Sequence, residues 1–358
     1  MRYESIRSLR GIAAALVVIY HACEYVRLHS SPASDLSFAF GAIGVDLFFV
    51  ISGFVMMTAI NPKNANSTGP QDAFYFFLKR LARIVPMYWL STIFLYTIYL
   101  TFKSKFQNLI ITPDKFIDSI LFIPVISSSG NLSPVVNQGW TLHHELFFYL
   151  MVSTLIAINA SRRAATLLPI ALIFIYITIT LSGASDNFIV MGSGMNFEFG
   201  MGCLLSIVSS RKLSLRQHII LGLAATAAVS AALLIDYSSY RTLARSLSWG
   251  AASVLVAWLA IINDKWFKGP VAALSGLLGD ASYSIYLFHG ISFSAGALIL
   301  KKIEPQCSNA SSIVYLTVFS FIGGYFVYRL IEKPCLHWLT KKINNLKYLN
   351  RLPYPRPK

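Results

Sequence analysis

The stretch SLRGIAAALVVIYH, residues 8–21, is apolar for most of its length but carries an arginine and a histidine. Arg10 and His21 are eleven positions apart, which in an α-helix is a rise of about 16.5 Å and a rotation that ends ~20° from the starting face. Ionisable groups inside a membrane span cost free energy, so they mark a face that points into a helical bundle. The stretch therefore predicts an uncleaved first membrane span with one polar face, since no small-residue cleavage site follows it at His21-Ala-Cys-Glu24.

The composition of the whole chain agrees with a membrane protein. Of the 358 residues, 55% are hydrophobic and 13% are charged, whereas soluble domains carry about 25% charged residues. Apolar runs of about 18–25 residues recur, each long enough to cross a hydrocarbon core of ~30 Å as a helix. The pattern predicts an all-α, polytopic transmembrane helical bundle of about ten spans, with approximate cores at 11–28, 41–60, 84–102, 140–158, 165–182, 188–208, 217–235, 244–262, 282–300 and 312–331.

The basic residues set the expected orientation. If the N-terminus is cytoplasmic, 22 of the 30 lysines and arginines lie in the inside segments, and such an excess marks cytoplasmic loops. An N-in, C-in topology follows, with a transmembrane domain over residues 1–335 and a basic cytoplasmic tail over residues 336–358. The net charge of +15 thus serves topology and not nucleic-acid binding, because no long basic stretch falls in a water-exposed domain.

The longest predicted outside segment, residues 103–139, contains an apolar stretch from Phe116 to Ile126 that is too short to span a membrane. The turn-rich sequence SSSGNLSPVVNQG follows it. Two interpretations are open: a re-entrant or interfacial element that covers an outward-facing cavity, or a surface loop with one amphipathic helix.

Two acidic residues lie near the outer ends of predicted spans. Asp46 is near the start of the second span, and Glu145 is near the start of the fourth. Both would enter the bundle on the side toward which His21 points, and a carboxylate bonded to an imidazole can fix its tautomer and raise its basicity. The same carboxylates could instead cap their helices, because acidic groups are favourable near helix N-termini.

Further polar residues share faces of predicted spans. Arg80 and Arg83, at the cytoplasmic entry of the third span, are spaced i, i+3 and place two guanidinium groups on one face, a geometry suited to phosphate. Ser282 and His289 in the ninth span are seven positions apart and also share a face. Plainer roles are open for each, because arginines near an interface anchor a span or snorkel, and a buried histidine can bond to a backbone carbonyl.

The sequence predicts no metal site. Adjacent His143 and His144 beside Glu145 point to different helix faces, and no third ligand is evident. The cysteines have no C-x-x-C spacing and are expected to pack as small apolar side chains; they are Cys23, Cys203, Cys307 and Cys335.

Several motifs follow one another along nearly the whole chain. Arg10 and His21 form an R-x10-H pattern, and Arg80 and Arg83 form an R-x-x-R pair. The others are GVDLFFVISGF (44–54), RIVPMYW (83–89), QGWTLHHELFFY (138–149), NFEFGMG (196–202), LGDASYSIYLFHG (278–290) and IEKP (331–334). In order and spacing they resemble the acyltransferase-3 family of bacterial membrane O-acyltransferases, in particular its exopolysaccharide O-acetyltransferase branch. One position departs from the family, which usually has asparagine or serine and then a large residue where this chain has His143-His144.

The resemblance implies an acyl-CoA-dependent O-acyltransferase, with cytosolic acetyl-CoA as donor substrate and a sugar hydroxyl of a cell-surface glycan or lipid-linked oligosaccharide as acceptor. Donor phosphates are then expected to bind the arginines Arg10, Arg80 and Arg83. The expected catalytic residues are His21, as general base or acyl carrier, with Glu145 and Asp46. The expected substrate contacts are Trp140, Ser282, Tyr283 and His289.

The expected setting is the bacterial cytoplasmic (inner) membrane, with the lipid bilayer around the spans and polysaccharide-synthesis proteins as candidate partners. A transporter or flippase of lipid-linked sugars would also need about ten helices and buried charges. An inactive scaffold for a polysaccharide synthase is a third alternative. The lack of a visible inverted repeat and the cytoplasmic position of the arginine pair favour the enzyme, and the sequence leaves the oligomeric state open.

Overall fold

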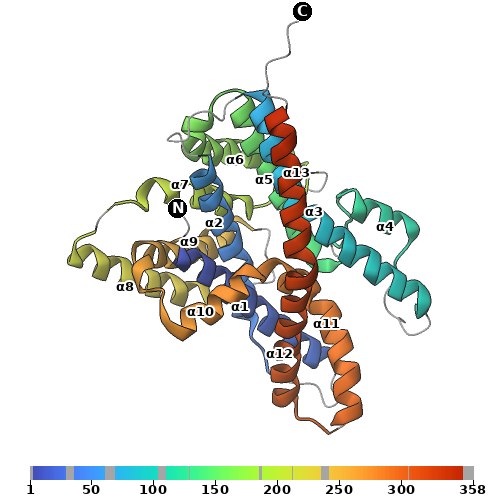
Figure 1. Cartoon of the computed structure of the whole chain (residues 1–358). Helices are drawn as coiled ribbons and strands as arrows, with labels where there is room; N and C mark the ends of the chain where they lie inside the picture. The colour runs from blue at the N-terminus through green and yellow to red at the C-terminus, as the bar shows by residue number, and fades with distance from the viewer. Residues whose placement is uncertain are drawn as a thin grey trace, which may run out of the picture.

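The computed structural model describes residues 3–29, 36–60, 69–103, 110–128, 130–184, 188–211, 213–234, 242–304 and 306–349. Within these ranges the chain is helical, apart from turns and an isolated antiparallel bridge between Ile126 and Leu132 (Figure 1). The α-helices are α1 (Glu4–His29), α2 (Ile43–Ala59), α3 (Pro70–Thr101), α4 (Pro113–Ile120), α5 (Trp140–Ala157), α6 (Ala164–Leu181), α7 (Asn196–Val208), α8 (Leu215–Ala232), α9 (Leu243–Ile262), α10 (Gly269–Asp280), α11 (Ser282–Ile303), α12 (Asn309–Val327) and α13 (Lys333–Leu349). The predicted all-α fold class is confirmed.

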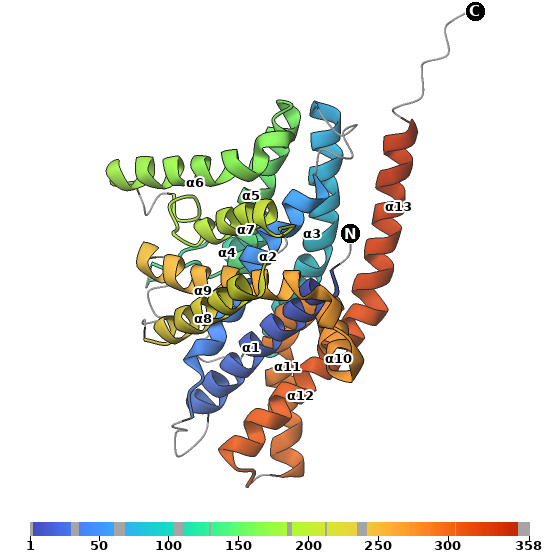
Figure 2. The same ribbon diagram turned by 90° about the vertical axis from the view of Figure 1, so that its left-hand side faces the viewer.

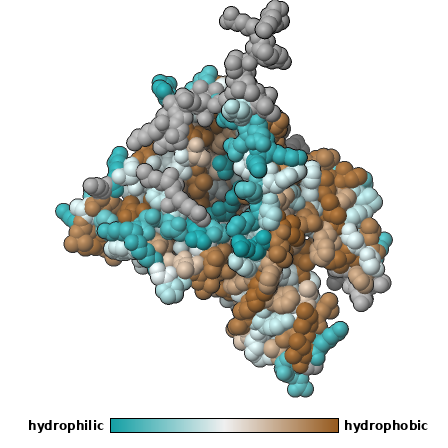
Figure 3. All heavy atoms as spheres, viewed as in Figure 1, coloured by the Kyte–Doolittle hydropathy of each residue, from teal (hydrophilic) through white to brown (hydrophobic). Residues whose placement is uncertain are grey.

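The lengths of the helices suit a multi-pass membrane protein. Among the described residues, eight helical stretches are long and apolar enough to cross a membrane, and they coincide with eight of the ten predicted spans. The other two predicted spans correspond to α5, which carries two histidines and a glutamate, and to α7, which has 13 residues because residues 188–195 before it form turns. Apolar side chains cover much of the surface over α4, α11 and α12 (Figure 3), as contact with lipid requires. The total of ten spans and the N-in orientation stay predictions.

Small residues let the central helices approach one another closely. A methyl group added to Gly11 of α1 would collide with the backbone of Ser275 in α10, and one added to Gly53 of α2 would collide with the backbone of Phe199 in α7. Gly202 of α7 faces the backbone of α2 in the same way. Close backbone contact at small residues is how membrane helices commonly pack. The helices that carry Arg10, His21 and Asp46 are thereby held in a fixed arrangement.

The last helices form one long rod. α12 passes through a π-helical turn at Tyr328–Glu332 into α13, and α13 runs beside α3 (Figures 1 and 2). Lys347 Nζ lies 2.8 Å from Asp72 Oδ1 at the start of α3. The part of the expected tail up to residue 349 is therefore a helix that packs on α3, while residues 350–358 lie outside the described residues.

The described part of the segment 103–139, residues 103, 110–128 and 130–139, contains features of both interpretations. α4 is one short helix that packs against α3. Trp89 Nε1 of α3 donates to the carbonyl oxygen of Ile120 at the end of α4, at 2.9 Å. The chain then folds back, with the backbone N–H of Val135 donating to Ser119 Oγ at 2.9 Å. The returning segment lines a cavity.

Candidate active site

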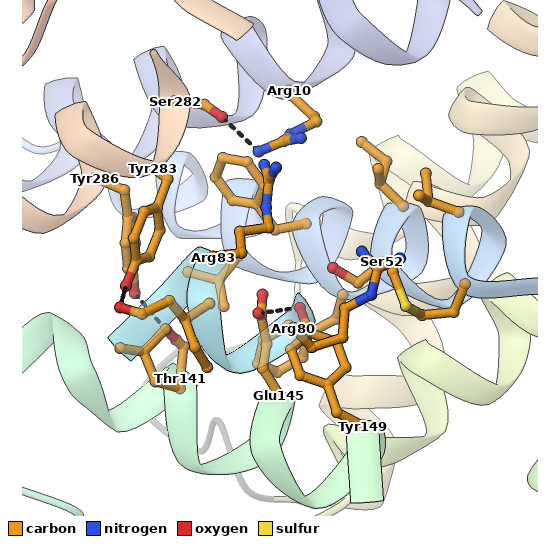
Figure 4. A pocket seen from close by; sticks show the side chains of 18 residues that line it. Arg10, Ser52, Arg80, Arg83, Thr141, Glu145, Tyr149, Ser282, Tyr283 and Tyr286 are labelled. Atoms are coloured by element: carbon orange, nitrogen blue, oxygen red, sulfur yellow. Dashed lines mark hydrogen bonds between the residues drawn. The ribbon is translucent and has the colours of Figure 1, made fainter. Parts of the chain in front are cut away.

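A cavity of about 130 Å³ lies between α1, α2, α3, α5 and α11, and three arginines line it (Figure 4). Arg10 Nη2 donates to Ser282 Oγ at 3.0 Å. Arg80 lies over the Phe76 ring at 5.1 Å, and its buried Nε has no hydrogen-bond partner among the described residues. Arg83 is the third arginine in the lining. Guanidinium N–H groups that lack a protein acceptor favour an anionic ligand, so this space, the inner cavity, is suited to phosphate.

Glu145 lies in the inner cavity together with the arginines (Figure 4). The Tyr149 hydroxyl donates to Glu145 Oε2 at 2.6 Å. The sequence had suggested that Glu145 would lie beside His21, but His21 lines a different cavity. Among the described lining residues Glu145 is the one carboxylate against three arginines, which leaves the inner cavity positively charged.

A larger cavity, of about 530 Å³, is lined by His21 of α1, Arg245 of α9 and the chain that returns from α4 to α5. In the predicted orientation it faces outward, and we name it the outer cavity. Its polar and aromatic lining consists of Tyr20, His21, Ser127, Asn131, Ser133, Asn137, Gln138, Trp140, Arg245 and Tyr286. Behind this wall, Lys115 Nζ donates to Ser133 Oγ at 3.4 Å, and partial burial lowers the pKa of Lys115. Amides, hydroxyls and aromatic rings of this kind suit a polar, ring-shaped molecule.

The hydrogen bond of His21 defines its tautomer. His21 Nδ1 lies 3.0 Å from the carbonyl oxygen of Val17. A carbonyl oxygen only accepts, so Nδ1 carries the hydrogen and, in the neutral ring, Nε2 carries the lone pair. A neutral imidazole with its lone pair at Nε2, in the wall of a polar cavity, has the form that a general base requires.

His289 is fully buried behind His21, with the two ring centroids 4.8 Å apart. Its Nδ1 lies 2.6 Å from the carbonyl oxygen of Tyr286, and its Nε2 lies 3.1 Å from Gln138 Nε2. It lines neither cavity. His289 therefore reaches the outer cavity through Gln138 and His21, although the sequence had suggested direct contact with the substrate.

Asp46 is fully buried and lines neither cavity. It accepts two hydrogen bonds from Arg245, at 2.7 and 2.9 Å, and Glu198 Oε1 lies 3.7 Å from the same guanidinium group. Arg245 also lies over the Trp249 ring at 4.4 Å. Asp46 is thus linked to the outer cavity through Arg245, and its expected pairing with His21 is replaced by this ion pair.

The two cavities share a wall. Val45 and Tyr286 line both of them. The Tyr286 hydroxyl lies 3.2 Å from Thr141 Oγ1 and 3.3 Å from the carbonyl oxygen of Gln138, and its ring packs edge-on against Phe48. Helices α1, α5 and α11 contribute residues to the inner and the outer side of this wall, so one rigid set of helices connects the two sites.

The four expected substrate contacts separate into three groups. Trp140 lines the outer cavity, whereas Ser282 and Tyr283 line the inner cavity. The Tyr283 hydroxyl donates to the carbonyl oxygen of Ile84 at 2.6 Å, which ties α11 to α3. His289 lies behind both sites. The geometry associates Ser282 and Tyr283 with the arginines, and the roles of all four stay predictions.

Sequence reasoning missed four residues of this region, namely Gln138, Glu198, Arg245 and Glu332. Arg245 and Glu198 belong to spans in which a single ionisable residue could have drawn attention. Glu332 is 3% exposed and accepts from Ser284 Oγ at 2.6 Å, at the end of the π-helical turn. Gln138, Glu198 and Glu332 lie in motifs that the sequence already singled out, QGWTLHHELFFY, NFEFGMG and IEKP.

His143 and His144, where this chain differs from the usual family pattern, pack inside the helical bundle. His143 Nδ1 lies 3.2 Å from the carbonyl oxygen of Gly139, and His144 Nδ1 lies 3.1 Å from Asn196 Oδ1 of α7. No group of three or more His, Cys, Asp or Glu that could hold a metal ion occurs in the part of the chain that the structure describes.

Comparison with known proteins defines the class of the protein. A family model described as an acyltransferase domain matches residues 3–329. The chain belongs to the acyltransferase-3 family and is a multi-pass membrane acyltransferase, as the motifs predicted.

Individual relatives narrow the class to the polysaccharide-related part of the family. The exopolysaccharide production protein ExoZ of Rhizobium meliloti (strain 1021) is 30% identical over 325 residues, which cover 86% of this chain and 93% of ExoZ. The peptidoglycan O-acetyltransferase OatA of Listeria monocytogenes is 24% identical over 92% of this chain, which spans 55% of the length of OatA. The putative peptidoglycan O-acetyltransferase YrhL of Bacillus subtilis is also 24% identical, over 91% of this chain and 54% of YrhL. No solved structure matches the chain.

Proposed function

We propose that the protein transfers an acyl group, with acetyl as the expected group, from a cytosolic acyl-CoA to a sugar hydroxyl of an exopolysaccharide or another cell-surface glycan. One observation carries the proposal: an arginine-lined cavity and a histidine-lined cavity meet at a wall formed by Val45 and Tyr286. The family membership and the names of the relatives support acetylation of polysaccharide. The proposed location is the bacterial cytoplasmic membrane, with the arginines toward the cytosol.

The donor occupies the inner side. Arg10, Arg80 and Arg83 bind the phosphate groups of the donor through charge-assisted hydrogen bonds. The acyl thioester extends from there toward His21, along the face of α1 that Arg10 and His21 share. Tyr286 stands between the cavities, so its side chain rotates aside when the thioester passes.

The acceptor sugar, on a lipid-linked oligosaccharide or a growing polysaccharide, occupies the outer cavity. In direct transfer, His21 Nε2 takes the proton of the sugar hydroxyl while its oxygen attacks the thioester carbonyl carbon. Once the new C–O bond has formed, the C–S bond breaks. His21 gives the proton to the thiolate, which leaves as CoA thiol.

In the alternative route His21 carries the acyl group. Nε2 attacks the thioester carbonyl carbon, and the thiolate leaves and takes the proton of the ring. The acyl-imidazole then gives its acyl group to the oxygen of the sugar hydroxyl, whose proton restores the one that the ring has lost. Both routes need the lone pair at Nε2 that the Val17 hydrogen bond provides.

The test uses purified full-length protein, radiolabelled acetyl-CoA and polysaccharide from an exopolysaccharide-producing bacterium. We expect label on the glycan with the wild-type protein and a loss of about 10²- to 10⁴-fold in rate with His21→Ala. His218→Ala is the matched control, because His218 Nδ1 also bonds to the carbonyl oxygen four residues earlier but lies outside both cavities. Substantial transfer by a folded His21→Ala protein would overturn the role of His21, and no label with the wild-type protein would favour a transporter or a scaffold.

A further inference from the structure

Gln138 joins the outer cavity to α11. It lines the outer cavity, its backbone carbonyl oxygen lies 3.3 Å from the Tyr286 hydroxyl, and its side-chain amide meets His289. Gly290 leaves room for that amide, because a methyl group there would lie 3.0 Å from Gln138 Nε2. Main chain and side chain of Gln138 are therefore both fixed by α11.

The ring of His289 fixes the direction in which the Gln138 amide points. His289 Nδ1 meets the carbonyl oxygen of Tyr286 at 2.6 Å, so Nδ1 is the donor and Nε2 of the neutral ring is the acceptor. The Gln138 atom 3.1 Å from His289 Nε2 is then the amide nitrogen, which donates. The amide oxygen Oε1 is directed away from His289, and no described residue donates a hydrogen bond to it.

His21 presents a second acceptor atom to the same cavity. His21 packs on the His289 ring with centroids 4.8 Å apart, and Gln138 bonds to an atom of that ring. His21 and Gln138 are therefore neighbours in the lining of the outer cavity. Nε2 of His21 and Oε1 of Gln138 both require an O–H or N–H donor from whatever binds there. Two hydroxyl groups on adjacent carbons of a sugar ring supply two such donors side by side.

We propose that the acceptor is a sugar with two adjacent free hydroxyl groups, of which one gives its proton to His21 and is acylated while its neighbour donates a hydrogen bond to Gln138 Oε1. The inference rests on the proposed function and adds the class of acceptor and the residue that recognises it, Gln138. Gln138 touches the acceptor, and His289 is a positioning residue that acts through Gln138. The neighbouring hydroxyl keeps its proton throughout, so the transfer needs no further reactant.

The test measures acyl transfer from labelled acetyl-CoA to p-nitrophenyl β-glucoside, galactoside and mannoside, and to the derivatives of each that lack one hydroxyl. With wild-type protein we expect removal of the hydroxyl next to the acylated one to lower kcat/KM about tenfold, as loss of one hydrogen bond does. With Gln138→Met we expect the parent sugar to lose about tenfold already and the deoxy sugar to lose nothing more. Gln138→Glu keeps an acceptor oxygen but loses the N–H group that donates to His289 Nε2, so we expect it to lose part of the discrimination.

Acetyl-CoA binding, measured on the same samples, separates a folded variant from an unfolded one and should be unchanged in Gln138→Met. Gln71→Met, the same change at an exposed position outside both cavities, is the control. Equal activity of wild-type protein on parent and deoxy sugars, or undiminished discrimination by folded Gln138→Met, would overturn the inference and leave the proposed function standing. If the wild-type protein labels polysaccharide but no sugar of the panel, the inference is overturned and the proposed function stands, whereas no label on polysaccharide or on any sugar means that both fail.

Discussion

The inner and outer cavities both contain arginine, but the arginines have different surroundings. In the inner cavity Arg10 is bonded to a serine hydroxyl, Arg80 lies over a phenyl ring, and the one described carboxylate of the lining accepts from a tyrosine. In the wall of the outer cavity Arg245 holds Asp46 with two hydrogen bonds and has Glu198 nearby. The first arrangement leaves positive charge for a ligand, and the second uses it within the protein.

The difference shows that the hydrogen-bond partners of a buried arginine indicate whether its charge is available to a ligand or is paired within the protein. Arginine donors without a protein acceptor are costly to bury and are satisfied when an anion binds. An arginine that is already paired with carboxylates contributes little net charge to the cavity beside it. The molecule therefore has a positively charged cavity on one side of Tyr286 and a cavity of amides, hydroxyls and aromatic rings on the other, as the proposed phosphate-bearing donor and sugar acceptor require.

The largest expected effect comes from breaking the pairing on the outer side. Asp46→Asn leaves Arg245 buried with a weakened partner, and removal of one member of a buried ion pair costs about 3 kcal/mol of unfolding free energy. We expect a markedly lower unfolding temperature, measured by thermal denaturation of the purified protein in detergent. Asp114→Asn, an exposed position on α4, is the control.

The double variant Asp46→Asn/Arg245→Met should recover part of the lost stability, because it removes the unpaired charge. If Asp46→Asn instead folds as stably as the wild-type protein but no longer transfers acyl groups, Asp46 has the catalytic role that its position in the sequence first suggested, and the contrast between the two cavities is weakened.

A smaller effect is expected from the unpaired arginines of the inner cavity. Arg80→Ala should weaken acetyl-CoA binding by about 10- to 100-fold, since a hydrogen bond to a charged group contributes roughly 1.5–3 kcal/mol. The KM for the sugar acceptor should stay the same, because Arg80 does not line the outer cavity. Isothermal titration with acetyl-CoA and acceptor kinetics measure the two quantities, and Arg216→Ala on the exposed start of α8 is the control. An equal loss of donor and acceptor affinity would contradict the division of labour between the cavities.

The extent to which these sites could be predicted depends on whether their residues share a helix. The common faces of Arg10 with His21 and of Arg80 with Arg83 follow from helical periodicity within one span. The partners of Asp46 and Glu145 do not, because they depend on which helices pack together: Arg245 is 199 positions from Asp46, and Glu145 meets the arginines of α1 and α3 across the bundle. Close contact at Gly53 and Gly202 shows one such pairing, of α2 with α7, and a sequence without a known fold does not show which helices pair.

The smallest effect is expected at the wall itself. Tyr286→Phe keeps the ring against Phe48 but removes the hydroxyl that lies between Thr141 and the Gln138 carbonyl. One such hydrogen bond contributes about 1 kcal/mol, so we expect its loss to change the rate of acyl transfer less than tenfold. A wall that opens more readily should admit water to the thioester, and release of CoA without acceptor should rise a few-fold relative to transfer, as a thiol assay can measure. Tyr315→Phe on α12, outside both cavities, should leave both rates unchanged, and an unaltered ratio of hydrolysis to transfer in Tyr286→Phe would show that the tyrosine hydroxyl does not keep the two sites apart.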